Sequence, residues 1–253
     1  MTELNNVLAG ISAELGDTND TDSLGGNFII LPTGLYDAVI DDVYLQASTK
    51  ENSKSVSAVV VYKIENPADP ENPVEHTARH TILGVDGSNL TKDLKSGKKK
   101  YLFGFENLNT LALVATGKEI RELTQKNQLV EIYDSNTRKK EPTEVPVLAE
   151  MSGKKVKLLI EEQRVNKKVQ NPKGEWVATN EDKQTNQVVK TVHHTGATLT
   201  EAREQTPEPL FVKAWLDKNQ GKIKDKFKTV ADSAVAGTPS TGAASSGTAK
   251  PLF

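Results

Sequence analysis

Cationic and aromatic side chains stand together in a short segment before the middle of the chain. Lys98, Lys99 and Lys100 come directly before Tyr101 and Phe103. Ammonium groups neutralise phosphates, and flat aromatic rings offer faces on which bases stack. This combination favours contact with a single strand of nucleic acid. The alternative is an ordinary solvated loop whose aromatic rings belong to the core.

A second basic group lies on or beside an alternating apolar segment at 154–165 and on the limb that follows it. A tryptophan stands just after a Pro-Lys-Gly turn, so a hairpin here would carry an aromatic ring near its tip. Such a hairpin could clamp a strand of nucleic acid, although the tryptophan could equally pack on its own hairpin. The predicted contacts in this group are Lys155, Lys157, Arg164, Lys167, Lys168 and Trp176.

Alternation along residues 74–84 divides the polar side chains between two strand faces. Thr77 and Arg79 fall on one face, whereas His76 and His80 fall on the other. A guanidinium on an exposed polar face could meet a phosphate or stack on a base, so Arg79 is a further predicted contact. The two histidines lack an obvious third ligand, and a metal site needs three or more. We therefore predict no metal site and no cofactor.

Signals for an enzyme are weak. The segments GKKK, GKEI and GKKV lack the upstream glycine and the following Ser or Thr of a phosphate-binding loop. Asp37, Asp41 and Asp42 could be imagined as a two-metal nuclease cluster. Such sites usually draw their acids from several elements, whereas these three would lie along one strand. The chain is predicted not to be an enzyme, and a metal-dependent nuclease is the least favoured alternative.

Charge is distributed unevenly along the chain of 253 residues, whose net charge is -2. Residues 1–42 contain eight acids and no Lys or Arg, so removing eight from 34 acids leaves 26 against 32 basic residues, about +6, in the remainder. A basic body can bind a polyanion despite the acidic segment. The chain has no cysteine and no apolar run long enough to span a membrane, and the segment MTELNNVLAG lacks the positive charge that precedes the apolar residues of a signal peptide. These features predict a cytoplasmic protein without membrane contact.

Three extended segments precede the first convincing helix. They cover residues 34–47, 55–64 and 74–84, and each alternates between apolar and polar positions. In the first segment the apolar face switches near Asp41 and Asp42, which predicts a β-bulge at that point.

A helix is predicted at 105–117, because Leu108, Leu111 and Ala112 recur at helical spacing and Gly117 supplies a C-terminal stop. Extended patterns return at 154–165, and later at 176–178 and 186–194. A second helical stretch, 209–227, completes the predicted domain.

The two ends of the chain differ from this body in composition. Residues 1–26 are predicted to form an acidic, flexible N-terminal arm, and residues 27–228 the folded domain. Residues 229–253 are rich in Ala, Gly, Ser and Thr, which predicts a disordered tail. The tail ends on an apolar tip, Pro251, Leu252 and Phe253. A tip of this kind suits a small apolar pocket on a protein partner.

Several of these segments together resemble the single-stranded DNA-binding proteins of phages. The similarity rests on LPTGLYDAVIDDV, SGKKKYLFGFENLNTLALVATG and GKKVKLLIEEQ, and it spans roughly residues 28–195. The first segment departs from the family pattern, because Leu35 separates Gly34 from Tyr36. The resemblance implies a mainly β, OB-fold-like barrel with one helix between strands three and four. Hairpin insertions, a C-terminal helix and a disordered tail would complete this architecture.

The resemblance also implies a function. Proteins of this family bind single-stranded DNA without sequence specificity and protect it during phage DNA replication or recombination, in the cytoplasm of the host. Their tails resemble this one in ending on a Phe that recruits replication proteins, although those tails are typically acidic and this one has Asp232 as its only acid. Because fold does not fix function, a protein-interaction or virion scaffold protein on the same barrel is the main alternative. The sequence leaves open whether the chain forms an oligomer.

Overall fold

The computed structural model describes residues 29–230, except 135, 136, 138, 172, 173 and 207. The predicted acidic arm, and the predicted tail from residue 231 to its apolar tip, lie outside the described residues.

The described part of the chain is mainly β, as predicted. Its strands are β1 (Gly34–Ala47), β2 (Val56–Ile64), β3 (Val74–Leu83), β4 (Leu90–Lys92), β5 (Lys99–Tyr101), β6 (Lys126–Asp134), β7 (Lys139–Val147), β8 (Lys155–Gln170), β9 (Trp176–His193) and β10 (Ile223–Asp225). Its helices are α1 (Phe103–Thr116), α2 (Leu199–Arg203) and α3 (Leu210–Asn219), with short 3-10 turns η2 (Ile120–Glu122) and η3 (Ala149–Met151). None of the described helices is long and apolar enough to cross a membrane.

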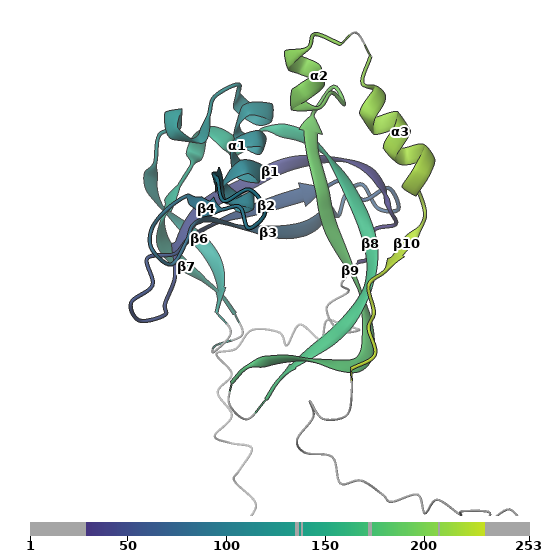
Figure 1. The fold of residues 1–253 in the computed structure, drawn as a ribbon. Helices are drawn as coiled ribbons and strands as arrows, with labels where there is room; N and C mark the ends of the chain where they lie inside the picture. The colour runs from purple at the N-terminus through teal and green to yellow at the C-terminus, as the bar shows by residue number, and fades with distance from the viewer. Residues whose placement is uncertain (1–28, 135–136, 138, 172–173, 207, 231–253) are drawn as a thin grey trace, which may run out of the picture.

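Strand β1 is the centre of the main sheet (Figure 1). It pairs antiparallel with β2 on one side, and β2 in turn pairs with β3. On its other side β1 pairs first with β8, and near its end it meets β7 of the β6–β7 hairpin. Strand β8 pairs along its length with β9. The small β4–β5 hairpin forms a separate sheet.

Alternating apolar residues explain why this sheet has a buried inner face. Val60, Tyr62 and Ile64 of β2 are fully buried in the main core, together with Ile40 of β1 and Leu158 of β8. The pairing of β1 with β2 shifts register between Ile40 and Asp42, which confirms the predicted bulge. The bulge lets β1 direct apolar residues inward on both sides of the shift. The opposite face of β1 and β2 packs against the β6–β7 hairpin in a second, smaller core.

Helix α1 covers one end of the main core. Its Leu108, Leu111 and Ala112 are buried, and Gly117 ends it in the left-handed conformation with φ 75°, as the sequence predicts. The helix begins at Phe103, two residues before the predicted start. Among the described elements, α1 contacts β3 on one side and β9 on the other, so it lies across the space between these two strands.

The predicted barrel is not closed by strand pairing. Within the described residues, β3 pairs only with β2, and β9 pairs only with β8. The sheet therefore curves around the core but remains open between β3 and β9. The helix also does not lie directly between the third and fourth strands of the chain, because the β4–β5 hairpin precedes it.

Beyond the start of β1, where Gly34 pairs with Ile160, strands β8 and β9 continue as a long arm (Figure 1). Strand β10 runs parallel to β8 along this arm, from Ile223 opposite Glu162 to Asp225 opposite Arg164. The prediction of one helix over 209–227 is therefore wrong in its second half. Helix α3 ends at Asn219, and the left-handed Gly221, with φ 69°, turns the chain into the extended strand.

Candidate nucleic-acid interface

A groove of about 650 Å³ lies in the opening between β3 and β9. Its two walls are the edge strands β3 and β9. The start of α1 forms one end of the groove. Its lining comes from β3 (residues 76–81), from Phe103, Gly104 and Asn107 of α1, from Glu161, from residues 186–189 of β9, and from Lys224 and Lys226.

The groove carries an excess of positive charge. Arg79, Lys224 and Lys226 line it, against the single acid Glu161. The hollow beside α1 is lined by two acids and two basic residues, and the hollow between β3 and β6 by four acids and three basic residues. Among these three hollows of similar volume, the β3–β9 groove is the one whose lining has more basic than acidic residues, which favours an anionic ligand.

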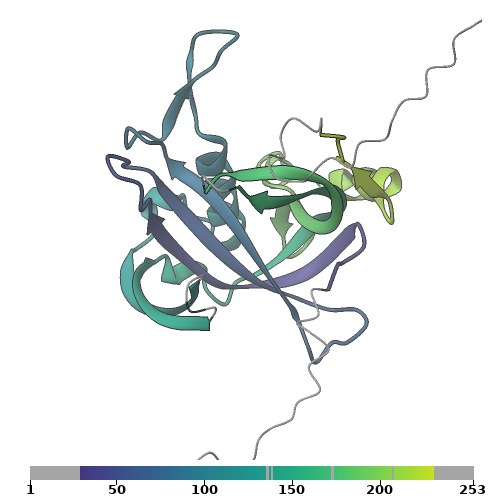
Figure 2. The ribbon, with the colours of Figure 1, turned by 90° about the horizontal axis from the view of Figure 1, so that it is seen from below.

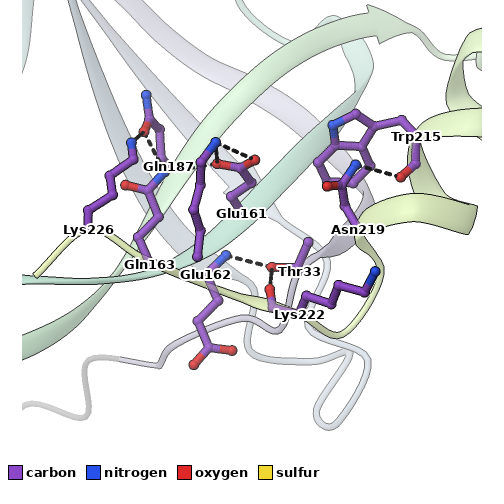
Figure 3. A network of polar contacts seen from close by, with 10 residues as sticks. Thr33, Glu161, Glu162, Gln163, Gln187, Trp215, Asn219, Lys222 and Lys226 are labelled. Atoms are coloured by element: carbon purple, nitrogen blue, oxygen red, sulfur yellow. Dashed lines mark hydrogen bonds and ion pairs between the residues drawn. The ribbon is translucent and has the colours of Figure 1, made fainter.

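A polar network forms the floor of the groove (Figure 3). Gln163, almost fully buried, donates from Nε2 to Glu161 at 3.0 Å and to Gln187 at 2.6 Å. Lys224 Nζ lies 3.0 Å from both carboxylate oxygens of Glu161, and Lys226 Nζ donates to Gln187 Oε1 at 3.1 Å. These bonds tie β8, β9 and β10 together, and they hold both lysines at the groove.

Asn186 fixes the β9 wall of the groove to the segment that leads into β1. Its side chain accepts a hydrogen bond from the Leu31 amide at 2.8 Å and donates to the Leu31 carbonyl at 2.7 Å. An Asn side chain used in this way substitutes for a strand partner, because it satisfies both backbone groups of one residue. The two hydrogen bonds therefore hold the β9 wall of the groove in place against the segment that leads into β1.

Phe103 stands at the end of the groove with 77% of its surface exposed. The next residue, Gly104, explains how the ring reaches this position. A Cβ on Gly104 would lie 2.6 Å from the Thr81 backbone nitrogen, and nearer still to the Thr81 carbonyl oxygen. Only glycine lets the start of α1 approach β3 so closely, and this approach puts the Phe103 ring beside the β3 edge.

Arg79 is exposed on the outer face of β3, as predicted. Its guanidinium donates to Gln46 Oε1 of β1 at 2.6 Å, which orients it across the sheet. Arg79 also lines a smaller hollow under the β1–β2 loop together with Lys50.

His76 and His80 form part of the β3 wall of the groove, half-buried on the face opposite Arg79. Burial lowers the pKa of both imidazoles below the usual value, because a low-dielectric environment disfavours the charged form. Both rings are therefore neutral at neutral pH. Among the described residues, no group of three or more His, Asp or Glu side chains is arranged to hold a metal ion.

The lowered pKa values predict a pH dependence of stability. Since the unfolded chain binds protons on His76 and His80 at a higher pH than the folded chain does, stability is lost as the pH falls below the unfolded pKa. Wild-type protein is expected to lose more free energy of unfolding between about pH 7 and about pH 5 than a variant carrying His76→Gln and His80→Gln. Urea titrations across this range test the difference. Equal losses in the two proteins would contradict it.

The predicted lysine run lies on the β4–β5 hairpin beside this site. Lys98 precedes β5, and Lys99, Lys100 and Tyr101 form it. Lys100 Nζ lies 3.3 Å from the Asp93 carboxylate. The Tyr101 ring stacks on Phe105 with a centroid distance of 5.0 Å. Phe105 is half-buried and packs against the main core, whereas Tyr101 is half exposed.

Two other predicted contacts lie away from the groove. Lys155 is exposed and lines a hollow with Asp37 and Asp41. Lys157 is half-buried and makes an ion pair with Asp37 at 2.7 Å, and Asp41 pairs with Lys63 at the same distance. These carboxylates, considered above for a nuclease, are thus each bound to a lysine.

The remaining predicted contacts are on the β8–β9 arm. Arg164 pairs with Asp182 at 2.7 Å and with Asp225 at 3.3 Å, and Lys167 pairs with Glu181 at 2.8 Å. These ion pairs link the strands of the arm. Lys168 is exposed, and Trp176 is 66% exposed near the tip. The arm therefore presents an aromatic ring, but most of its predicted cations already have carboxylate partners.

Of the predicted residues, the structure brings only Arg79 and Phe103 into the groove. Sequence reasoning missed Lys224 and Lys226, because their segment was predicted to be helical. The signal against a helix was Gly221, which comes directly before this segment. Neither the models of known protein families nor the sequences of curated proteins match the chain.

Proposed function

We propose that this protein binds single-stranded DNA without sequence specificity, through the β3–β9 groove. The observation that carries the proposal is the exposed Phe103 ring at the end of a groove that is also lined by Lys224 and Lys226. Binding of single strands without sequence preference requires two elements. One is a row of cations along the path of the phosphates, and the other is an exposed aromatic ring on which a base can stack.

The strand order supports the same proposal. A meander β1–β2–β3, a helix, and then β8 and β9, with β8 returning to pair with β1, is the order of an OB-fold barrel. In this chain the barrel is open where its third and last strands would meet, and the groove occupies that opening. Phosphates would lie against Lys224 and Lys226, and a base would stack on Phe103.

The proposed role is to coat transient single strands during phage replication or recombination, in the host cytoplasm. No bond is made or broken in this role. Capture of replication or recombination proteins through the tip at Pro251, Leu252 and Phe253 belongs to the same proposal. A scaffold or virion protein on this fold would have no need of a cationic groove.

The experiment is a binding titration of the full chain with labelled single-stranded DNA, duplex DNA and RNA of equal length, repeated at several salt concentrations and with magnesium present. We expect tight, salt-dependent binding of single-stranded DNA and intact oligonucleotide after incubation. Absence of binding to every nucleic acid would favour the scaffold alternative, and shortened product in magnesium would favour the nuclease.

Replacing Lys98, Lys99 and Lys100 with alanine tests the hairpin's part in this function. Each lysine that meets a phosphate contributes about -0.7 to the slope of log affinity against log salt for single strands. The triple variant is therefore expected to bind more weakly and with a flatter slope. If both quantities stay at wild-type values, the three lysines are a solvated loop.

A further inference from the structure

The β4–β5 hairpin projects from the body of the protein as a narrow finger (Figure 2). At its turn, Leu94 is 100% exposed. Residues 90–101 contain five lysines and Asp93 as their one acid. The finger therefore combines a strongly cationic stem with a single apolar tip.

The turn that presents Leu94 is well ordered. The Asp93 carboxylate accepts hydrogen bonds from the amides of Lys95, at 2.8 Å, and Ser96, at 2.9 Å. The amide of Gly97 donates to the Asp93 carbonyl at 2.8 Å, and Gly97 has the left-handed φ of 68° that this turn requires. The amides of Ser96 and Lys95, together with Lys100, lower the pKa of Asp93 to about 2.

These bonds keep the Leu94 side chain exposed to water. The side chain therefore contributes no free energy of burial to the folded protein. A partner that suits the finger must offer an apolar space and also a dense anionic surface. The end of a nucleic-acid duplex has both, because its stacked base pairs are apolar and its two backbones carry phosphates. Proteins that kink or open duplexes insert leucine and other apolar side chains between base steps.

The root of the finger joins the proposed binding track. Tyr101, the last residue of β5, stacks on Phe105 and is two residues from Phe103 at the end of the groove. A strand that leaves the groove past Phe103 would therefore run along the stem toward the tip. The duplex from which that strand emerges would meet Leu94 first.

We propose that the finger is a wedge that opens duplex DNA at its junction with a single strand, with Leu94 entering the terminal base step and the stem lysines holding the phosphates. The proposal rests on the proposed function, since the groove must hold the single strand. It adds an activity, because a protein that only coats single strands has no need of an apolar tip at a duplex end.

The test uses the full-length protein and a forked DNA with 2-aminopurine in the base pair next to the junction. Wild-type protein is expected to raise the fluorescence, because the base becomes unstacked. Leu94→Ala is expected to reduce this rise by about tenfold at saturating protein, while its affinity for an unpaired oligonucleotide stays within about twofold. The matched control is Leu129→Ala, on β6, whose side chain is 73% exposed and lies outside the groove.

The outcomes separate the two proposals. If wild-type protein binds single strands but leaves the fork fluorescence unchanged, or if Leu94→Ala opens the fork as wild-type protein does, the wedge is overturned and the proposed function stands. If wild-type protein binds no single strand, the proposed function fails. If wild-type protein binds vesicles that contain an anionic phospholipid and leaves the fork fluorescence unchanged, the wedge is overturned and the tip is assigned to a lipid surface instead.

Discussion

Phe103→Ala is expected to weaken binding of single-stranded DNA by about 1–3 kcal/mol, roughly fivefold to a hundredfold, with the salt dependence unchanged. The ring is 77% exposed at the end of the groove, so its removal deletes a stacking surface without creating a cavity. The melting temperature should therefore stay near the wild-type value. Fluorescence polarisation with a short labelled oligonucleotide at several salt concentrations measures both the affinity and the slope.

Phe211→Ala is the matched control for this experiment. Phe211 lies on α3, its ring is 41% exposed, and it does not line the groove. Lys190 Nζ lies 4.9 Å from the centroid of the Phe211 ring. Phe211→Ala therefore also removes an aromatic ring from the surface, but at a place outside the groove. If Phe103→Ala binds like wild type, or if the two variants lose equal affinity, the groove is not where bases stack.

Gly104→Ala is expected to destabilise the protein by about 3 kcal/mol or more, at the upper end of what overpacking usually costs. The added methyl would meet the backbone of Thr81, which cannot rotate away as a side chain can. The start of α1 would then move away from β3, and Phe103 would move with it. We expect both a lower urea midpoint and weaker binding of single-stranded DNA in the protein that remains folded.

Gly117→Ala separates this steric effect from the ordinary effects of replacing glycine. Gly117 ends the same helix, and a Cβ there meets nothing within 4 Å, but its φ of 75° is left-handed. That substitution should cost only about 1 kcal/mol, through backbone strain. If Gly104→Ala loses no more free energy of unfolding than Gly117→Ala does, α1 adjusts easily to the added methyl group.

Local patterns in the sequence predicted the central meander and α1 well. Val60, Tyr62 and Ile64 alternate because one face of β2 points into the main core, and Gly117 ends α1 because glycine adopts the left-handed conformation at no cost. Patterns of this kind depend only on near neighbours. The β4–β5 hairpin gave no such signal, since its strands are three residues long and largely exposed.

The groove was harder to predict, because its parts come from distant positions in the chain. Arg79 and Phe103 could be chosen by type and local context. Lys224 could not, because its position depends on a parallel pairing of β10 with β8, about sixty residues earlier. The arm shows a different limit of local reasoning: Arg164 was chosen for its charge, and its ion pair with Asp182 across the strand pair could not be read from its own neighbours.

The position of β1 at the centre of the sheet has a consequence for how the chain folds during synthesis. Its first neighbour, β2, and the next strand, β3, are complete at Leu83, but its neighbour β8 on the other side begins only at Lys155. At synthesis rates of about 5–20 residues per second, this interval lasts about 4–14 seconds. Contacts over such long sequence separations form slowly. The apolar side of the nascent meander therefore stays open to chaperones, or to other nascent chains, until the ribosome has passed β8.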